Sequence, residues 1–204
     1  SNYLDIKREK VRQRIEEKRS ATVGLKMPTD IMPYVGNERG IKPDTYKKFE
    51  AFMSSRSPFN DRIVFPIRDI TGRIVAFQGR LRMNSHIKDQ PKYIFYPPKA
   101  ILPLYPTRVT PIKSRVILVE GIYDVVNLHD KGLTNSLCMF GVNNMNEQKL
   151  QLLKMTGVDQ VDIILDPDEA GQKAAEKTQE LCENVGLKHY NIRLPAESGD
   201  PGDL

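Results

Sequence analysis

The feature that most constrains this chain is a regular alternation of apolar runs and helical patterns from residue 115 onward. Short apolar runs, typical of buried parallel strands, occupy residues 116–119, 133–140, 161–165 and 188–194. Between them, the spacing of apolar side chains predicts helices over residues 122–130, 147–155 and 169–185. Alternating strands and helices with short connections predict a parallel sheet with helices on both faces. We therefore expect an α/β domain here.

Acidic residues follow three of these predicted strands. Glu120 comes after the first strand, Asp166 and Asp168 after the third, and Asp200 and Asp203 shortly after the last. Parallel strands end at the same edge of a sheet, so these carboxylates should converge there. Clustered carboxylates repel one another unless a divalent cation neutralises them, and oxygen-only ligands favour Mg²⁺ or Mn²⁺ over zinc.

The segment Asp166-Pro167-Asp168-Glu169-Ala170-Gly171 also has a purely structural interpretation. Aspartate is common in turns and as the N-cap of helices, so Asp168 could simply begin the helix predicted at residue 169. On this segment alone, the metal-site and helix-cap interpretations stay open.

Charge is divided unevenly along the chain. Residues 1–114 contain 23 Lys and Arg against 11 Asp and Glu, whereas residues 115–204 contain 8 against 15. The two parts therefore carry net charges of +12 and −7, which together give the overall +5. A charged helix near the N-terminus inflates the basic count, but residues 20–114 still contain 16 basic against 7 acidic residues. This division suits a part that binds polyanions joined to a part that binds cations, and nucleic acid with a divalent metal is the simplest pairing.

The first half of the chain lacks the βαβ pattern. We predict a charged surface helix over residues 3–19, a second helix over 43–53 and a β-hairpin over 62–80 with its turn at Asp69–Gly72. Residues 82–113 are rich in proline and predict loops with short strands. We therefore expect a charged N-terminal arm, a mixed α+β basic subdomain and a C-terminal α/β domain, over residues 1–20, 21–112 and 113–204.

Other sequence features exclude some protein classes. No run of about 18 apolar residues and no signal-peptide pattern occurs, so we expect a protein of the cytoplasm or nucleoid, without a membrane partner. Cys138 and Cys182 are far apart in sequence and predict two buried, reduced thiols rather than a disulfide or a zinc site.

Three motifs in the C-terminal half together resemble the TOPRIM domain of primases, topoisomerases and certain nucleases. They are the glutamate motif at 119–126, the DxD motif at 166–171 and a late acidic motif at 199–204. The order, spacing and predicted strand context of these motifs match that domain. The chain would then hold a TOPRIM domain that stops short of its C-terminal end.

The first half narrows the resemblance to the catalytic core of DnaG-type bacterial and phage primases. The segments that carry it are Arg62–Arg80, which reads as the primase strand–turn–strand pattern, Pro91-Lys92-Tyr93-Ile94, Leu104-Tyr105 and, as a helical entry, Gly40–Phe49. The resemblance covers most of residues 36–204. No Cys/His cluster is present, so no zinc is expected in this fragment.

The resemblance implies roles for particular residues. Glu120, Asp166, Asp168 and Asp200 would form the metal-binding cluster, with the first three also catalytic and two Mg²⁺ or Mn²⁺ ions bound. Asp124 belongs to the glutamate motif, although its helix position also suits simple surface exposure, and the role of Asp203 stays open.

Three basic residues of the first half also match positions of the primase core. Arg62, Arg80 and Lys92 would bind the template, the nascent primer or nucleoside triphosphates. Each of them could instead be a solvated strand residue.

The implied activity is that of a DNA primase, a nucleotidyltransferase that makes short RNA primers on single-stranded DNA from ribonucleoside triphosphates. A replicative helicase would be a further partner, through regions outside this chain. Two alternatives use the same TOPRIM domain: a nuclease that cleaves phosphodiesters, and a DNA-binding module without catalysis. The acidic cluster does not separate the nuclease from the primase, whereas the hairpin at 62–80 favours the primase.

Overall fold

The computed structural model describes residues 7–12, 14–15, 23–87 and 89–194. The chain forms two compact units. The N-terminal unit comprises Ser1–Glu38 and Tyr46–Leu102, and the C-terminal unit comprises Arg39–Thr45 and Pro103–Leu204. The second unit thus begins ten residues before the predicted boundary at 113 and also takes in a short upstream segment.

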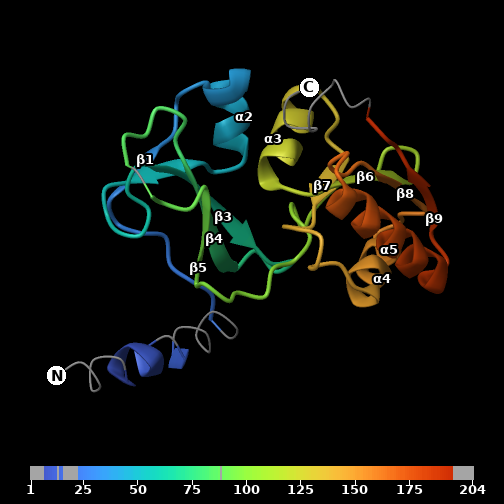
Figure 1. Ribbon diagram of the computed structural model, residues 1–204, viewed down its shortest axis with the longest axis horizontal. Helices are drawn as coiled ribbons and strands as arrows, with labels where there is room; N and C mark the ends of the chain where they lie inside the picture. Colours follow the sequence, from blue (N-terminus) through green and yellow to red (C-terminus); the bar gives the residue numbers. More distant parts are fainter. Residues whose placement is uncertain (1–6, 13, 16–22, 88, 195–204) are drawn as a thin grey trace. The chain divides into compact units, whose positions relative to one another are not determined.

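The N-terminal unit is built on a five-stranded antiparallel sheet with the strand order β1-β2-β3-β4-β5 (Figure 1). Its strands are β1 (Ile31–Pro33), β2 (Phe52–Ser54), β3 (Arg62–Arg68), β4 (Ile74–Leu81) and β5 (Tyr93–Tyr96). The predicted hairpin is confirmed as β3 and β4. At its turn, the Gly72 N–H donates to the Asp69 carbonyl at 2.9 Å, and Gly72 has a φ of +89°, which favours glycine.

The predicted helix over 43–53 is wrong in its second half. Helix α2 covers only Pro43–Lys48, and Phe52 belongs to strand β2. Glu50 adopts a left-handed φ of 55°, which ends the helix and redirects the chain. Phe52 is then 1% exposed and packs edge-to-face on Phe59. The apolar spacing therefore reflects two successive elements that bury their side chains against different partners, since Tyr46 of α2 stacks on Phe65.

Part of the predicted N-terminal helix can be compared with the structure. Residues 7–12 and 14–15 are helical, and Val11 and Ile15 are each 53% exposed. The rest of 3–19 lies outside the described residues.

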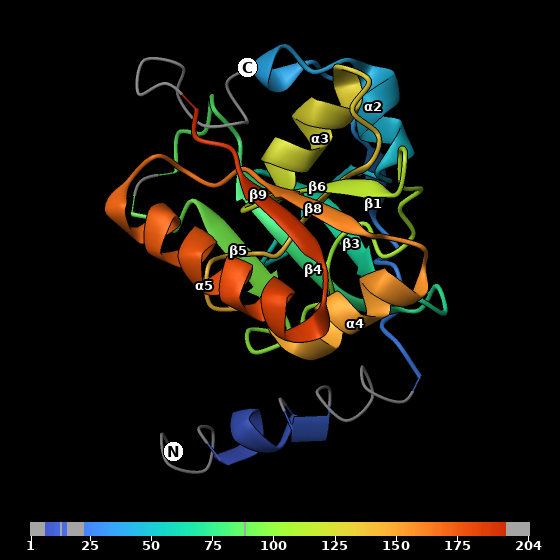
Figure 2. The ribbon, with the colours of Figure 1, turned by 90° about the vertical axis from the view of Figure 1, so that its right-hand side faces the viewer.

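The C-terminal unit is a four-stranded, all-parallel sheet with the strand order β7-β6-β8-β9. Its elements are β6 (Arg115–Val119), α3 (Ile122–Asp130), β7 (Ser136–Cys138), α4 (Glu147–Met155), β8 (Gln160–Ile163), α5 (Glu169–Val185) and β9 (Lys188–Asn191). Helix α3 lies on one face of this sheet, and α4 and α5 lie on the other (Figure 2). The predicted parallel sheet with helices on both faces is confirmed. β7, β8 and β9 are shorter than the apolar runs suggested, whereas β6 is one residue longer.

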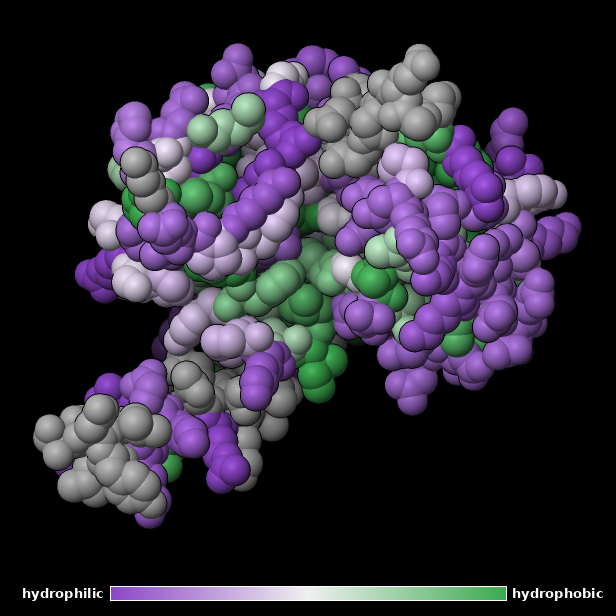
Figure 3. All heavy atoms as spheres, in the orientation of Figure 1, coloured by the Kyte–Doolittle hydropathy of each residue, from purple (hydrophilic) through white to green (hydrophobic). Residues whose placement is uncertain are grey.

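The core of this unit lies between the central strands and α5. Val116 and Leu118 of β6 and Val161 of β8 are completely buried, and Ala175 of α5 packs in the same cluster. The outer sides of α4 and α5 carry mostly polar side chains (Figure 3). Helices with one apolar side of this kind are stabilised mainly by packing against the sheet.

Cys138 and Cys182 are buried free thiols, as predicted. Burial raises the pKa of Cys138 well above its ordinary value and that of Cys182 to about 12. Over the described part of the chain, no helix is long and apolar enough to cross a membrane.

Candidate active site

Two of the predicted acidic residues leave the sheet from neighbouring strands. β6 and β8 pair in parallel with Leu118 opposite Ile163, and the Ile164 N–H donates to the Leu118 carbonyl at 2.8 Å. Glu120 directly follows β6, and Asp166 lies three residues beyond the end of β8. Both residues are half-buried. The pairing therefore brings Glu120 and Asp166 to the same edge of the sheet, as the sequence predicts.

The loop after β7 lies at the same edge. The Gly141 N–H donates to the Glu120 carbonyl at 3.2 Å, and the Asn144 N–H donates to the Gly141 carbonyl at 3.1 Å. The Lys149 ammonium in turn donates to the Asn144 carbonyl, and burial lowers the pKa of Lys149. The loop thus holds the carbonyl group of Glu120 itself, and the segment after β8 holds that of Leu118, two residues earlier.

Asp124 has a structural role in the glutamate motif. The Gly121 N–H donates to its carboxylate at 2.8 Å, which satisfies an amide at the start of α3. Asp124 is only 8% exposed, so the interpretation as a surface side chain is wrong. This hydrogen bond helps to fix the start of α3 directly after Glu120.

Asp168 is the N-cap of α5. Its Oδ1 accepts a hydrogen bond from the Gly171 N–H at 2.7 Å, and its φ and ψ of −72° and 170° are extended. A Cβ atom on Gly171 would lie 2.2 Å from the Asp166 carbonyl oxygen, so only glycine lets the helix approach the turn this closely. The helix-cap interpretation is therefore confirmed. It engages one oxygen of an exposed carboxylate and does not exclude the metal interpretation.

Two residues that the sequence did not single out support the same turn. The Gln172 side-chain amide donates to the Asp166 carbonyl at 3.2 Å, and the Asn191 amide donates to Gln172 Oε1 at 3.4 Å. Their only sequence signal is position, because Gln172 lies in the first turns of the helix and Asn191 ends the next strand.

The donor set suits a hard divalent cation. Glu120, Asp166 and Asp168 supply only carboxylate oxygens, which are the ligands that Mg²⁺ and Mn²⁺ prefer. Within the ranges that the structure describes, no group of three or more His, Cys, Asp or Glu side chains is gathered to hold a metal ion. Asp200 and Asp203 lie outside those ranges. Glu120, Asp166 and Asp168 thus match a divalent cation in donor chemistry and lie at one edge of the sheet, but the structure does not gather the three carboxylates into a metal-binding group.

The predicted basic residues lie on the sheet of the N-terminal unit, where Arg62 is an interior group. It is 2% exposed, and its Nη1 donates to the Pro91 carbonyl at 2.9 Å. Burial lowers the pKa of Arg62, and its side chain lines a cavity of about 150 Å³. A Cβ on Gly79 would lie 3.1 Å from Arg62 Cδ, so glycine leaves room for the arginine. The interpretation of Arg62 as a solvated strand residue is wrong.

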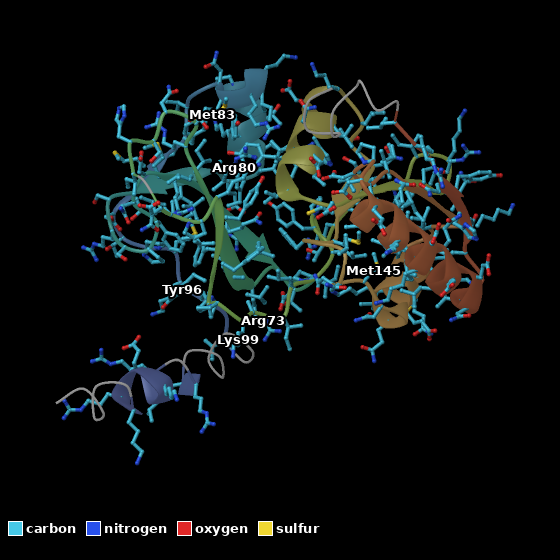
Figure 4. All side chains as sticks on the ribbon, viewed as in Figure 1. Arg73, Arg80, Met83, Tyr96, Lys99 and Met145 are labelled. Carbon is cyan, nitrogen blue, oxygen red and sulfur yellow. The ribbon has the colours of Figure 1, made fainter. Side chains whose placement is uncertain are left out.

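Arg80 and Lys92 share one tyrosine. Arg80 is 8% exposed, its Nη1 donates to the Tyr93 hydroxyl at 2.6 Å, and its guanidinium carbon lies 5.1 Å from the ring centroid. The Lys92 ammonium lies 5.7 Å from the same centroid. Arg80 and Arg73 mark opposite ends of β4 (Figure 4). Sequence reasoning missed the role of Tyr93 as the common partner.

The pairing of β3 with β4 separates the two predicted arginines. Arg62 lies opposite Leu81, whereas Arg80 lies opposite Ile63. Paired residues share a face and successive residues alternate, so Arg62 and Arg80 project from opposite faces of the sheet. The structure thus brings Arg80 and Lys92 together at Tyr93. Arg62 lies on the opposite face of the sheet, where it donates to the backbone of the segment that carries Lys92 and Tyr93.

Comparison with known proteins identifies both parts of the chain. Residues 117–204 match the family model described as Toprim-like, and residues 47–101 match the DNA primase catalytic core, N-terminal domain. The DNA primase of Pseudomonas putida is 35% identical over 157 residues, which cover 72% of this chain and 23% of that protein.

Solved structures agree with these sequence matches. The Aquifex aeolicus primase, solved with its zinc-binding and RNA polymerase domains, aligns with a TM-score of 0.67 and 26% identity over 80% of this chain and 49% of that one. A DNA primase domain from Pseudomonas aeruginosa aligns with a TM-score of 0.58 and 29% identity over 76% and 51%. This chain spans about a quarter of the length of the curated relatives that it matches.

Proposed function

The chain belongs to the DnaG-type primases with a TOPRIM domain, and we propose that it carries out nucleotidyl transfer in primer synthesis. The reaction joins ribonucleoside triphosphates into a short RNA primer on a single-stranded DNA template. The observation that carries this proposal is the common edge at which Glu120 and Asp166 leave neighbouring parallel strands, beside the turn capped by Asp168. In open α/β sheets, that edge is where ligands bind.

The chemistry at this edge is attack by a 3′-hydroxyl on the α-phosphorus of a nucleoside triphosphate, with pyrophosphate as the leaving group. Two Mg²⁺ or Mn²⁺ ions, when bound, would lower the pKa of the hydroxyl and stabilise the charge that develops on the phosphates. Glu120, Asp166, Asp168 and Asp200 are the residues that we propose to hold them. The protein's own contribution is to fix these carboxylates, and the cap at Asp168 and the close approach of Gly171 do so for the turn.

The basic residues of the N-terminal unit would bind phosphates. Arg80 and Lys92 place two cations around the Tyr93 ring, and like charges held close together favour an anion between or beside them. Arg62 donates to the Pro91 carbonyl and so would act by supporting the segment that carries Lys92 and Tyr93. We propose the template strand, the primer and the triphosphates as ligands of this surface, and a replicative helicase as a partner of the whole protein in the cytoplasm or nucleoid.

The test is primer synthesis on single-stranded DNA by the full-length protein with Asp166→Asn or Asp168→Asn. Each change removes a negative charge and keeps the size of the side chain, and we expect synthesis to fall at least 100-fold. Glu169→Gln is a matched control, because this neighbouring carboxylate is exposed and forms an ion pair with Lys173 on the outside of α5. Normal synthesis by both aspartate variants would refute the assignment.

The same reaction mixture separates the primase from the nuclease alternative. Labelled single-stranded DNA is incubated with Mg²⁺ or Mn²⁺, with and without ribonucleotides, and the products are scored as primers or as cleaved template. Primers that depend on ribonucleotides support the proposal. Cleavage without ribonucleotides that is lost in Asp166→Asn would replace it with a nuclease, and binding without either product would leave a DNA-binding module.

A further inference from the structure

A short chain of side-chain hydrogen bonds leads from the last described strand to the acidic turn. The Asn191 amide donates to Gln172 Oε1 at 3.4 Å, and the Gln172 amide donates to the Asp166 carbonyl at 3.2 Å. We propose that Gln172 and Asn191 are positioning residues that set the orientation of Asp166 for metal binding. This inference rests on the proposed function, because it takes Asp166 to be a metal ligand.

The fold places both residues where they can perform this role. β9 runs parallel to β8 with Asn191 opposite Ile163, so Asn191 ends its strand at the edge where Asp166 emerges. The Gln172 N–H donates to the Asp168 carbonyl at 3.0 Å, which fixes the backbone of Gln172 in the first turns of α5. The side chain of Gln172 is thus held by the helix at its base and by Asn191 at its tip.

The hydrogen bond from Gln172 reaches the backbone of the turn that carries Asp166. This turn lies between the end of β8 and the start of α5. The Asp166 carbonyl oxygen faces the helix, since a Cβ on Gly171 would lie 2.2 Å from it. A hydrogen bond to this oxygen restrains the peptide plane and therefore the position of the backbone from which the Asp166 side chain projects. Metal ligands need such support, because small changes in ligand orientation weaken binding strongly.

The side-chain amides of Gln172 and Asn191 should contribute more to the orientation of the acidic turn than to the stability of the fold. Both hydrogen bonds are longer than the usual distance of about 2.9–3.0 Å, so each contributes little to folding. Asn191 Oδ1 is buried without a partner in the described part of the chain, which is unfavourable for stability. Loss of Gln172 should therefore change metal binding much more than it changes thermal unfolding.

The helix supplies its own control. Gln179 lies seven residues after Gln172, on the same side of α5, and its amide contacts His189 Nδ1 of β9 at 3.1 Å. The two glutamines thus have the same residue type, the same helix, the same partner strand and similar partial burial. They differ in that the side chain of Gln172 donates to the acidic turn, whereas that of Gln179 contacts His189.

The experiment measures Mn²⁺ binding to the full-length protein by electron paramagnetic resonance, without DNA or nucleotides, together with thermal unfolding in the absence of metal. We expect Gln172→Leu to weaken Mn²⁺ binding by about 10-fold or more, the usual cost of losing a group that orients a ligand. Gln179→Leu should leave binding within about 2-fold and lower the unfolding temperature by a similar amount to Gln172→Leu. Gln172→Arg, which restores a donor of sufficient reach, should recover most of the affinity, whereas Gln172→Glu, which removes only the donor, should not.

The Asp166→Asn variant separates a failure of the proposed metal site from a failure of the positioning role of Gln172. Loss of Mn²⁺ binding in Asp166→Asn with normal binding in both Gln172→Leu and Gln172→Glu would overturn the positioning role alone. Equal weakening in Gln172→Leu and Gln179→Leu would also overturn it, because the effect would then follow from packing of the helix. Normal Mn²⁺ binding in Asp166→Asn would overturn the proposed metal site and the positioning role with it.

Discussion

A single methyl group at Gly171 would collide with the turn that carries Asp166. The added Cβ would lie 2.2 Å from the Asp166 carbonyl oxygen, 3.0 Å from its carbonyl carbon and 3.1 Å from its nitrogen. All three neighbours are backbone atoms, which cannot rotate away as the end of a side chain can. Ordinary contacts are about 3.5 Å, so in Gly171→Ala the turn must move by about 1 Å.

The effects of Gly171→Ala on stability partly cancel. Forcing a group into a packed site costs about 1–3 kcal/mol, whereas replacing glycine by alanine within a helix gains up to about 1 kcal/mol. The net loss is about 0–2 kcal/mol, which lowers the unfolding temperature by at most about 8 °C in a chain of this size. A displacement of about 1 Å in a catalytic group lowers the rate by about 100-fold. Primer synthesis should therefore fall far more than the unfolding temperature accounts for.

Gly186→Ala is the matched control at the other end of α5. Gly186 is the C-cap with a φ of +71°, where alanine costs about 1–2 kcal/mol, and its Cβ would meet only the flexible end of Lys154. Both variants are assayed for primer synthesis at saturating Mn²⁺ and for thermal unfolding. Gly186→Ala should lose stability and keep its synthesis rate. If Gly171→Ala keeps more than half of the wild-type rate, or if both variants lose the same fraction, the reasoning about the turn is refuted.

Three further predictions concern other parts of the molecule. Arg62→Lys should destabilise the protein more than Arg62→Met in urea unfolding, because lysine keeps a buried charge without the reach to the backbone carbonyls; the reverse order would contradict this. Lys92→Ala should weaken binding of single-stranded DNA and reduce the slope of log affinity against log salt by about one, measured by fluorescence anisotropy, and an unchanged slope would exclude a phosphate contact. Burial raises the thiol pKa of Cys138 and of Cys182, so both thiols stay protonated in the native state at pH values where unfolded thiols ionise. The free energy of unfolding should therefore fall as the pH rises from about 9 towards 12, and it should fall less steeply in a variant with alanine at both positions. Equal slopes in the two proteins would count against the buried thiols.

The sequence predicts an element well where end signals and packing agree. The bounds of α3, α4 and α5 match the structure residue for residue, and Asn146 and Asp168 supply side-chain caps where α4 and α5 begin. The helix predicted over 43–53 failed because one stripe of aromatic residues served both a helix and the following strand. Periodicity cannot separate these cases when the break occurs at a non-glycine residue such as Glu50.

The candidate site divides in the same way. Glu120 and Asp166 could be predicted to share an edge, because parallel strands impose that geometry on any residue that follows them. Whether Arg62 and Arg80 lie on the same face or on opposite faces depends on the register between β3 and β4. The sequence predicts the alternation along each strand but not the pairing between the two strands. The Gln172–Asn191 contact joins a helix to a strand 19 residues away, and neither residue has a local pattern that marks it.

Asp168 shows why the two interpretations of the acidic turn are compatible. A carboxylate has about four acceptor positions on its two oxygens, and the cap to the Gly171 N–H uses one of them. That hydrogen bond fixes the side chain against the first turn of α5, and the same helix approaches Asp166 through Gly171 and Gln172. A cap that immobilises a carboxylate lowers the entropy that metal binding would otherwise have to remove. The feature that makes the motif ambiguous in sequence, an aspartate at a helix start, is therefore the feature that would prepare it as a ligand.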